Sequence, residues 1–276
     1  MMIENTRYRF ECTTKAAEIT SFFDKQSGIE YIWSGDSKYW GGRNPVLFPV
    51  IASSYNKKYW FDGKEYTMGN HGFARNSEFT LVEQTSDSIT LCLSSNDVTI
   101  AQYPFDFDLF VTYRLVDDTI IVKYRIVNLS DKQMPFAFGL HPAFNCPLTS
   151  DKTFDDYYLE FASACEVNGN NPAVDQGLIK TIKLSYELFN KYKTLSFDKL
   201  SSPYLSFTDG MHGVRVSTTG YSRVAVWTPQ APFICLEPWH PSNNKCDKDL
   251  EFKERDASFI LNEGQSFLTT YTISVF

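Results

Sequence analysis

The stretch FDLFVTYRLV-DD-TIIVKYRIVN, residues 107–128, decides the fold class. Apolar and polar side chains alternate along both halves, which is the period of a half-buried β-strand. Isoleucine, valine and tyrosine, residues that favour strands, are frequent in the second half. The stretch therefore predicts an antiparallel pair, Phe107–Val116 with Thr119–Asn128, joined through Asp117-Asp118.

Segments on both sides show the same period. They predict three more hairpins and a final strand: 59–61 with 64–68, 79–83 with 88–93, 214–217 with 223–227, and 266–275. The Asp62-Gly63 dipeptide supports the first of these hairpins, because it tolerates the positive φ values of a tight turn. A short helical pattern appears only at Tyr186–Tyr192.

Many short strands separated by turns are typical of an all-β protein, here a large antiparallel β-sandwich or a closed barrel. Residues 151–185 are the least regular part of the chain, but their composition is not that of a linker. Because the strands on both sides of them have the same character, we expect a single domain over residues 1–276.

The composition excludes several classes of protein. With 23 Phe, 16 Tyr and 5 Trp, the chain is too aromatic to be disordered. A net charge of −7 without a basic run argues against nucleic acid or an anionic membrane as partner. The sequence shows no apolar run of membrane-spanning length and no signal-peptide pattern. Since none of the six cysteines forms a CxxC pair, we expect reduced, structural thiols in a cytoplasmic protein.

Three titratable residues are candidates for a functional site. Gly, Pro and Asn place His71 and His141 at strand–loop junctions, where sites tend to form. Glu237 ends the apolar run 231–236 and precedes Pro238-Trp239. Partial burial there would raise its pKa and make it a better base near neutral pH. The alternative is an ordinary surface glutamate at a strand end. His212 lies in a turn and is assigned no role.

Several catalytic templates are absent from the sequence. Residues 41–44 (GGRN) lack the lysine of a phosphate-binding loop, and neither GxSxG nor HExxH occurs. A metal site would have to combine His71, His141 and His240, and no two of these have the close spacing of typical ligand pairs. We therefore predict no metal.

Four segments together resemble the aldose 1-epimerases (mutarotases), specifically the LacX-like branch that borders the hexose-6-phosphate epimerases. They are residues 39–49 (YWGGRNPVLFP), 70–77 (NHGFARNS), 139–145 (GLHPAFN) and 236–239 (LEPW). They occur in the family's order with family-like spacing, and the resemblance runs from about Phe10 to the C-terminus. It implies a galactose mutarotase-like β-supersandwich of many short strands around a central cleft.

The resemblance implies that the protein interconverts the α and β anomers of an aldohexose, or of its 6-phosphate, without a cofactor. Opening the sugar ring takes a proton from the anomeric hydroxyl and gives one to the ring oxygen, so the reaction needs a base and an acid. By resemblance Glu237 is the base and His141 the acid. His71 would hydrogen-bond the region of the ring oxygen and hold the sugar.

Expectations about the substrate also follow from the resemblance. It places Arg43 and Arg75 in the cleft, where two guanidiniums could grip a phosphate; for Arg75 the alternative is a structural salt bridge. Phe144 and Trp239 either stack on the apolar face of a sugar or belong to the core. The net charge of −7 opposes a phosphorylated substrate, so the arginines would have to supply the attraction.

Two segments depart from the family's pattern, and both bear on the identity of the sugar. Family members commonly carry an acidic residue between the second histidine and the terminal glutamate, where it binds sugar hydroxyls. Asp198 is the nearest acid here and is expected to take that role. After Trp239 the chain continues with His240-Pro241-Ser242-Asn243-Asn244 instead of a glycine-containing loop with an aspartate.

The leading hypothesis is an isomerase that acts on a small sugar or sugar phosphate as a monomer or homodimer. The first alternative is a non-catalytic carbohydrate-binding or sugar-sensing protein, and the second is a relative of polysaccharide lyases or glycosidases. A binding protein has no need for an acid and a base together, so His141 and Glu237 favour the enzyme.

Overall fold

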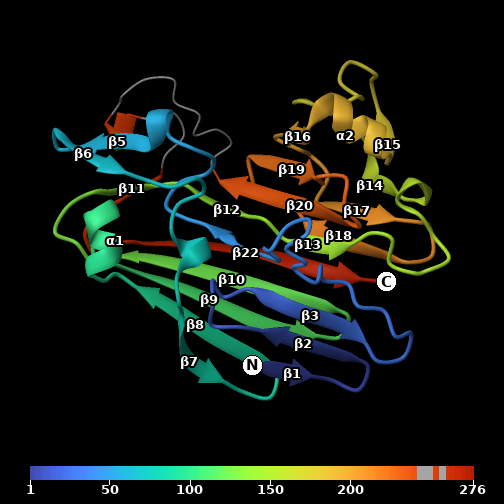
Figure 1. The fold of residues 1–276 in the computed structure, drawn as a ribbon, viewed down its shortest axis with the longest axis horizontal. Helices are drawn as coiled ribbons and strands as arrows, with labels where there is room; N and C mark the ends of the chain where they lie inside the picture. The colour runs from blue at the N-terminus through green and yellow to red at the C-terminus, as the bar shows by residue number, and fades with distance from the viewer. Residues whose placement is uncertain (241–250, 255–258) are drawn as a thin grey trace.

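Antiparallel β-sheets form nearly all of the regular structure (Figure 1). The structure, a computed structural model, describes residues 1–240, 251–254 and 259–276. Within these ranges the prediction of an all-β fold is confirmed, and no helix is long and apolar enough to cross a membrane. One cluster of buried apolar side chains has members from Ile3 to Val275.

The larger of the two main sheets has nine strands and extends from the lower left to the upper right of Figure 1. Its strands, in spatial order, are β15 (Ile179–Lys183), β14 (Tyr158–Cys165), β17 (Tyr204–Thr208), β18 (Gly213–Ser217), β22 (Ser266–Val275), β10 (Thr119–Asn128), β9 (Phe107–Val116), β8 (Ser88–Ser94) and β7 (Thr80–Gln84). Strands β9 and β10 pair over their whole predicted lengths, and every second side chain faces the core.

The second main sheet has six strands and lies above β22 and β10 of the first sheet in Figure 1. Its strands are β16 (Thr194–Asp198), β19 (Arg223–Trp227), β20 (Phe233–His240), β12 (Phe138–Leu140) and β4 (Val46–Leu47), with β13 (Ala143–Asn145) also paired to β20. One face of this sheet packs on the nine-stranded sheet. The ring centroids of Tyr124 and Phe138 are 4.9 Å apart, and those of Phe144 and Phe207 are 6.0 Å apart. The other face is therefore free to build a site.

Most of the predicted local elements are present. The structure contains the hairpins β5 (Lys58–Phe61) with β6 (Lys64–Thr67) and β7 with β8, the C-terminal strand β22, and the helix α2 (Tyr186–Tyr192). Asp62 and Gly63 both have positive φ, as the tight turn requires. The helix α1 (Asp97–Gln102), capped by Asn96, was not predicted from the sequence, because six residues are too few for a helical period to show. Strands β11 (Met134–Phe136) and β21 (Phe259–Leu261) form a further short pair.

One predicted hairpin is wrong. Residues 214–217 and 223–227 do not pair with each other, because they belong to different sheets: β18 pairs with β17 and β22, and β19 pairs with β16 and β20. The turn at Thr219-Gly220 lies in a connection that crosses from one sheet to the other. Alternation of apolar residues identifies a strand, but it does not identify the strand's partner.

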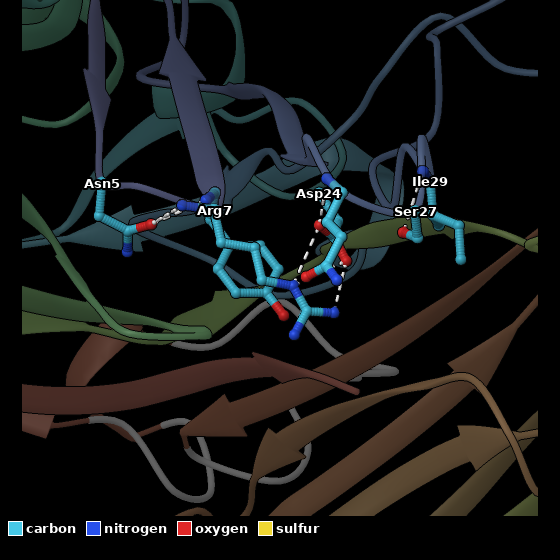
Figure 2. Close-up of polar contacts among 7 residues, drawn as sticks. Asn5, Arg7, Asp24, Ser27 and Ile29 are labelled. Carbon is cyan, nitrogen blue, oxygen red and sulfur yellow. Dashed lines mark hydrogen bonds and ion pairs between the residues drawn. The ribbon is translucent and has the colours of Figure 1, made fainter.

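A three-stranded N-terminal sheet packs against the nine-stranded sheet. It consists of β1 (Met2–Glu4), β2 (Tyr8–Cys12) and β3 (Ile19–Asp24), and the rings of Phe10 and Tyr113 lie 5.1 Å apart at the contact. Figure 2 shows the ion pair that links the start of β2 to the end of β3. Arg7 Nη2 donates to Asp24 Oδ2 at 2.7 Å, and Arg7 Nε contacts both carboxylate oxygens at 3.1 Å. The Asp24 side chain also accepts the backbone N–H of Gln26.

Asp24 makes stability depend on pH. Its hydrogen bonds with Arg7 lower the pKa of the Asp24 carboxyl, so this pair stabilises the fold above the unfolded pKa of about 3.9 and loses its effect as the pH falls further. We expect Asp24→Asn to lower the urea unfolding midpoint at pH 7, with the difference from wild type shrinking in acid. Asp87→Asn is the control, since Asp87 pairs with Arg114 at the exposed surface, where ion pairs contribute little. Equal losses in both variants would contradict the prediction.

Candidate active site

The pairing of β20 brings His141 and Glu237 together. On one side of β20, Gly139 of β12 pairs with Trp239, and Ala143 of β13 pairs with Cys235. His141 lies midway between these two pairs and therefore opposite Glu237. The resulting contact is 3.3 Å from His141 Nε2 to Glu237 Oε2. The sequence predicted both residues, and the sheet register explains why they meet although they are far apart in the chain.

Alternation along the strands decides which side chains share this face. Cross-strand partners in an antiparallel sheet point the same way, and successive residues point to opposite faces. The face of the six-stranded sheet that carries Glu237 therefore also carries His141, Cys235, Trp239 and Trp227. This face is turned away from the nine-stranded sheet.

A cavity of about 560 Å³ lies over this face. That volume is within the usual range for a small-molecule site. Segments before β4 and between β4 and β7 complete its walls. Its lining consists of Trp40, Ala52, Asn70, His71, Arg75, His141, Thr194, Trp227, Glu237 and Trp239. The structure thus brings together five of the predicted site residues: His71, Arg75, His141, Glu237 and Trp239.

Backbone geometry fixes the orientation of His71. Both His71 and Ala52 have positive φ, and each donates its backbone N–H to the other residue: His71 N–H to the Ala52 carbonyl, and Ala52 N–H to His71 Nδ1. Since Nδ1 accepts a hydrogen bond, the ring proton of neutral His71 must lie on Nε2. Gly72 follows with φ +73°, and a Cβ there would meet the Phe48 carbonyl oxygen at 2.1 Å, so only glycine fits.

Burial shifts the pKa values of His141 and Glu237 in opposite directions. Desolvation raises the pKa of the Glu237 carboxyl well above its ordinary value, and the nearby Trp239 and Arg75 oppose this shift without reversing it. Among the described residues, Trp239 Nε1 has no hydrogen-bond partner. Desolvation also lowers the pKa of His141 well below its ordinary value, with His71 and Arg75 adding to the effect. The buried pair therefore favours a state that holds one proton and carries no net charge.

Arg75 is the permanent positive charge in the cavity wall. It belongs to a short 3-10 turn, Ala74–Asn76, and is half-buried. The structural salt bridge considered as its alternative role does not form among the described residues, where its guanidinium has no hydrogen bond or ion pair. Burial lowers the pKa of Arg75, while Glu18 and Glu237 raise it. The guanidinium is thus available to a ligand.

Two tryptophans enclose His141. Its ring lies 4.8 Å from that of Trp40 at a tilt of 32°, and 5.6 Å from that of Trp227, edge to face. A Cβ on Gly42 would lie 2.6 Å from the Trp40 ring, so this glycine gives the indole its space. Neither tryptophan was predicted as a site residue. Trp40 lies in one of the four segments that carry the resemblance, and Trp227 ends a strand just before Pro229, which are signals that could have identified them.

Three predicted substrate-binding residues do not line the cavity. Phe144 is fully buried against Phe207, because alternation turns it to the face opposite His141. Asp198 lies on the cavity face but is paired with Arg223, Oδ1 to Nε, at 2.5 Å. The Arg43 guanidinium packs over Gly35, and the Arg43 backbone N–H donates to Glu18. The expectation that these side chains contact the sugar is therefore not supported.

The remaining histidines lie outside the cavity. His240 is three residues after Glu237, on the opposite face of β20, where its ring packs 4.0 Å from that of Tyr221. A metal site of His71, His141 and His240 therefore does not form. His212 lies in a turn, 3.9 Å from Asp209. The five cysteines in the described ranges are free and buried, whereas Cys246 and the departure at 241–244 lie outside those ranges.

His71 should stay neutral throughout the range in which histidines usually titrate. Burial and the Arg75 charge lower its pKa to about 4, against an ordinary value of about 6.5. We expect NMR of labelled protein to show an Nε2-protonated ring that does not titrate near neutral pH. Arg75→Gln should raise this pKa, since it removes the neighbouring charge. A midpoint near 6.5 in the wild type would contradict the geometry described here.

Comparisons with known proteins agree with this fold. The sequence profile of the aldose 1-epimerase family matches residues 2–257. The plasmid-encoded protein LacX of Lactococcus lactis subsp. lactis is 32% identical over 264 residues, which cover 86% of each chain. The chromosomal LacX protein of the same organism is 32% identical over 261 residues, again covering 86% of each chain.

Solved structures show the same architecture. A galactose mutarotase-like protein from Lactobacillus casei superposes with a TM-score of 0.91 at 26% identity, covering 100% of this chain and 99% of that one. A galactose mutarotase related enzyme from Lactobacillus acidophilus gives a TM-score of 0.91 at 29% identity, covering 100% and 97%. The predicted galactose mutarotase-like β-supersandwich is thus confirmed, and the chain belongs to the aldose 1-epimerase family.

Proposed function

We propose that the protein interconverts the α and β anomers of an aldohexose by acid–base opening and closure of the sugar ring. The observation that carries the proposal is the contact between His141 and Glu237 in the wall of a sugar-sized cavity. Family membership supports an activity on sugars. A site that only bound sugar would gain nothing from burying an acid–base pair, because desolvating both groups costs free energy.

The reaction needs two coordinated proton transfers. The Glu237 carboxylate takes the proton of the anomeric hydroxyl while protonated His141 gives one to the ring oxygen. The bond between C1 and the ring oxygen breaks, leaving an open-chain aldehyde. Rotation about the C1–C2 bond then presents the other face of the carbonyl group. Ring closure reverses both proton transfers and gives the opposite anomer.

The single proton of the pair suits this sequence. Before ring opening the proton lies on His141, and after it on Glu237, so the pair holds one proton throughout. Burial favours the arrangement with neutral His141 and protonated Glu237, which is the state that accompanies the open-chain sugar. The positive charge of Arg75 acts on both members of the pair: it stabilises the Glu237 carboxylate and disfavours protonated His141.

The remaining lining residues would position the sugar. His71 Nε2–H is a fixed donor, because the opposite ring nitrogen already accepts from Ala52, and it suits the ring-oxygen region. Trp40, Trp227 and Trp239 offer indole surfaces to the apolar face of a pyranose. They also exclude water from His141, which strengthens its electrostatic interactions.

We further propose that a 6-phosphorylated aldohexose is accepted and that Arg75 binds its phosphate. Support comes from the guanidinium itself, which lines the cavity without an ion pair among the described residues. If Glu237 is protonated at rest, Arg75 gives the cavity a local positive charge despite the net −7 of the chain. Arg43 does not share this role, because it lies outside the cavity.

Removing either member of the pair should abolish most of the acceleration. We expect His141→Asn and Glu237→Gln each to lower the catalysed rate by about 10²–10⁴-fold, the usual contribution of a positioned acid or base. Anomer exchange is followed by NMR or polarimetry on freshly dissolved α-D-glucose, α-D-galactose and glucose 6-phosphate.

Controls for this measurement are His212→Asn and Glu83→Gln, which change the same residue types far from the cavity and should keep the wild-type rate. Binding without acceleration for all three sugars would indicate a sugar-binding protein instead. Full activity in either site variant would show that the roles assigned to the pair are wrong.

The role of Arg75 predicts a selective effect on phosphorylated sugar. We expect Arg75→Gln to raise the KM for glucose 6-phosphate by roughly tenfold or more, since a hydrogen bond to a charged group is typically worth 1.5–3 kcal/mol. The KM for the free hexose should change less. Arg114→Gln, at a distant exposed ion pair, serves as the control. Equal changes for both sugars would contradict phosphate recognition by Arg75.

A further inference from the structure

Cys235 lies beside the acid–base pair and has no role in the proposed reaction. It is two residues before Glu237 on β20, on the same face of the sheet, and its side chain is fully buried. Burial and the neighbouring carboxyl raise the pKa of the Cys235 thiol, so it is protonated at neutral pH. A thiol in this position brings a soft metal ligand next to an imidazole and a carboxyl group.

Three potential ligand atoms converge here. One nitrogen of His141, the Cys235 sulfur and one oxygen of Glu237 all lie within 4.8 Å of one another. Ligand atoms around a tetrahedral zinc ion are roughly 3.3–3.8 Å apart, given bond lengths of about 2.0–2.3 Å. The His141–Glu237 separation of 3.3 Å already fits, and a movement of about 1 Å would bring the sulfur into place.

A second observation points to a ligand at this place. His141 is almost fully buried, and its Nδ1 atom has no hydrogen-bond partner among the described residues. No described residue therefore competes with an ion for this nitrogen.

We propose that His141, Cys235 and Glu237 form a zinc-binding site, and that zinc bound there inhibits the enzyme. The ion would engage both members of the acid–base pair and so prevent the proton transfers. No step of the proposed reaction uses a metal, so an ion at this place would act as an inhibitor. The inhibitory part rests on the proposed function, whereas the binding part does not.

The charge balance favours zinc binding in a buried site. On coordination the Cys235 thiol loses its proton, and the pair loses its single shared proton, both to solvent. The resulting thiolate and carboxylate carry two negative charges, which a divalent ion neutralises, while the imidazole is neutral. No net charge is then buried. A thiolate–imidazole–carboxylate set suits zinc better than magnesium or calcium, which prefer oxygen ligands.

Access and geometry are consistent with inhibition. His141 and Glu237 line the cavity, so an ion can reach them from the side that receives the sugar. Three protein ligands leave the fourth tetrahedral position open toward that cavity, where water or a sugar hydroxyl would complete the coordination. Zinc and sugar should therefore compete.

The test uses cobalt(II) as a spectroscopic substitute for zinc. Thiolate coordination gives cobalt(II) a characteristic charge-transfer absorption that does not depend on enzymatic activity. We expect this absorption in the wild-type protein and in Cys146→Ala, which removes a fully buried cysteine outside the cluster. It should be absent from Cys235→Ala and Cys235→Ser and should disappear from the wild type when zinc is added.

Activity assays then test inhibition. The zinc concentration for half-inhibition should rise by roughly tenfold or more in Cys235→Ala and Cys235→Ser, and should be unchanged in Cys146→Ala. Absence of the charge-transfer band in the wild type, or its persistence without Cys235, would overturn the zinc site. If the wild type binds cobalt through Cys235 but does not accelerate anomer exchange, the site stands and the proposed function fails.

Discussion

The contact between His141 and Glu237 depends on one interruption in the hydrogen bonds along one side of β20. Strands β12 and β13 pair with the same side of β20 in a continuous register, and His141-Pro142 lies between them. Proline has no N–H to donate, so the regular ladder stops there, although the Pro142 carbonyl still accepts the Leu236 N–H at 3.2 Å. This break leaves the His141 side chain opposite Glu237 on the face that forms the cavity.

The chemistry of the site follows from the burial that this position imposes. β20 has partners on both sides, so a carboxyl group in the middle of it is kept from water by the flanking strands and by the tryptophans above. Leaving a carboxylate and an imidazolium there would be costly, and the pair instead favours a single shared proton. Burying this pair lowers the stability of the fold, at a place where a shared proton can serve the proposed reaction. The same desolvation makes the neighbouring thiol and imidazole suitable for a metal ion.

The sequence located nine of the strands and five of the residues that line the cavity, but it did not identify every strand's partner. Alternation located β9 and β10 to the residue, but it paired residues 214–217 with 223–227 because it contains no information about which sheet a strand joins. The position of Phe144 was missed for a related reason. The motif placed this residue near His141, but side chains alternate between the two faces along β13, and Phe144 points into the core. Asp198 lies on the cavity face, but its pairing with Arg223 depends on a strand neighbour that the sequence does not specify.

The most direct test of the account asks whether His141 and Glu237 act as one unit that shares one proton. The measurement is the rate of anomer exchange in wild type, His141→Asn, Glu237→Gln and the double variant, under identical conditions. Residues that act as a unit give non-additive losses. We predict that the double variant is no slower than the slower single variant, since either change already disables the transfer. A double-variant loss equal to the product of the two single losses would contradict the account.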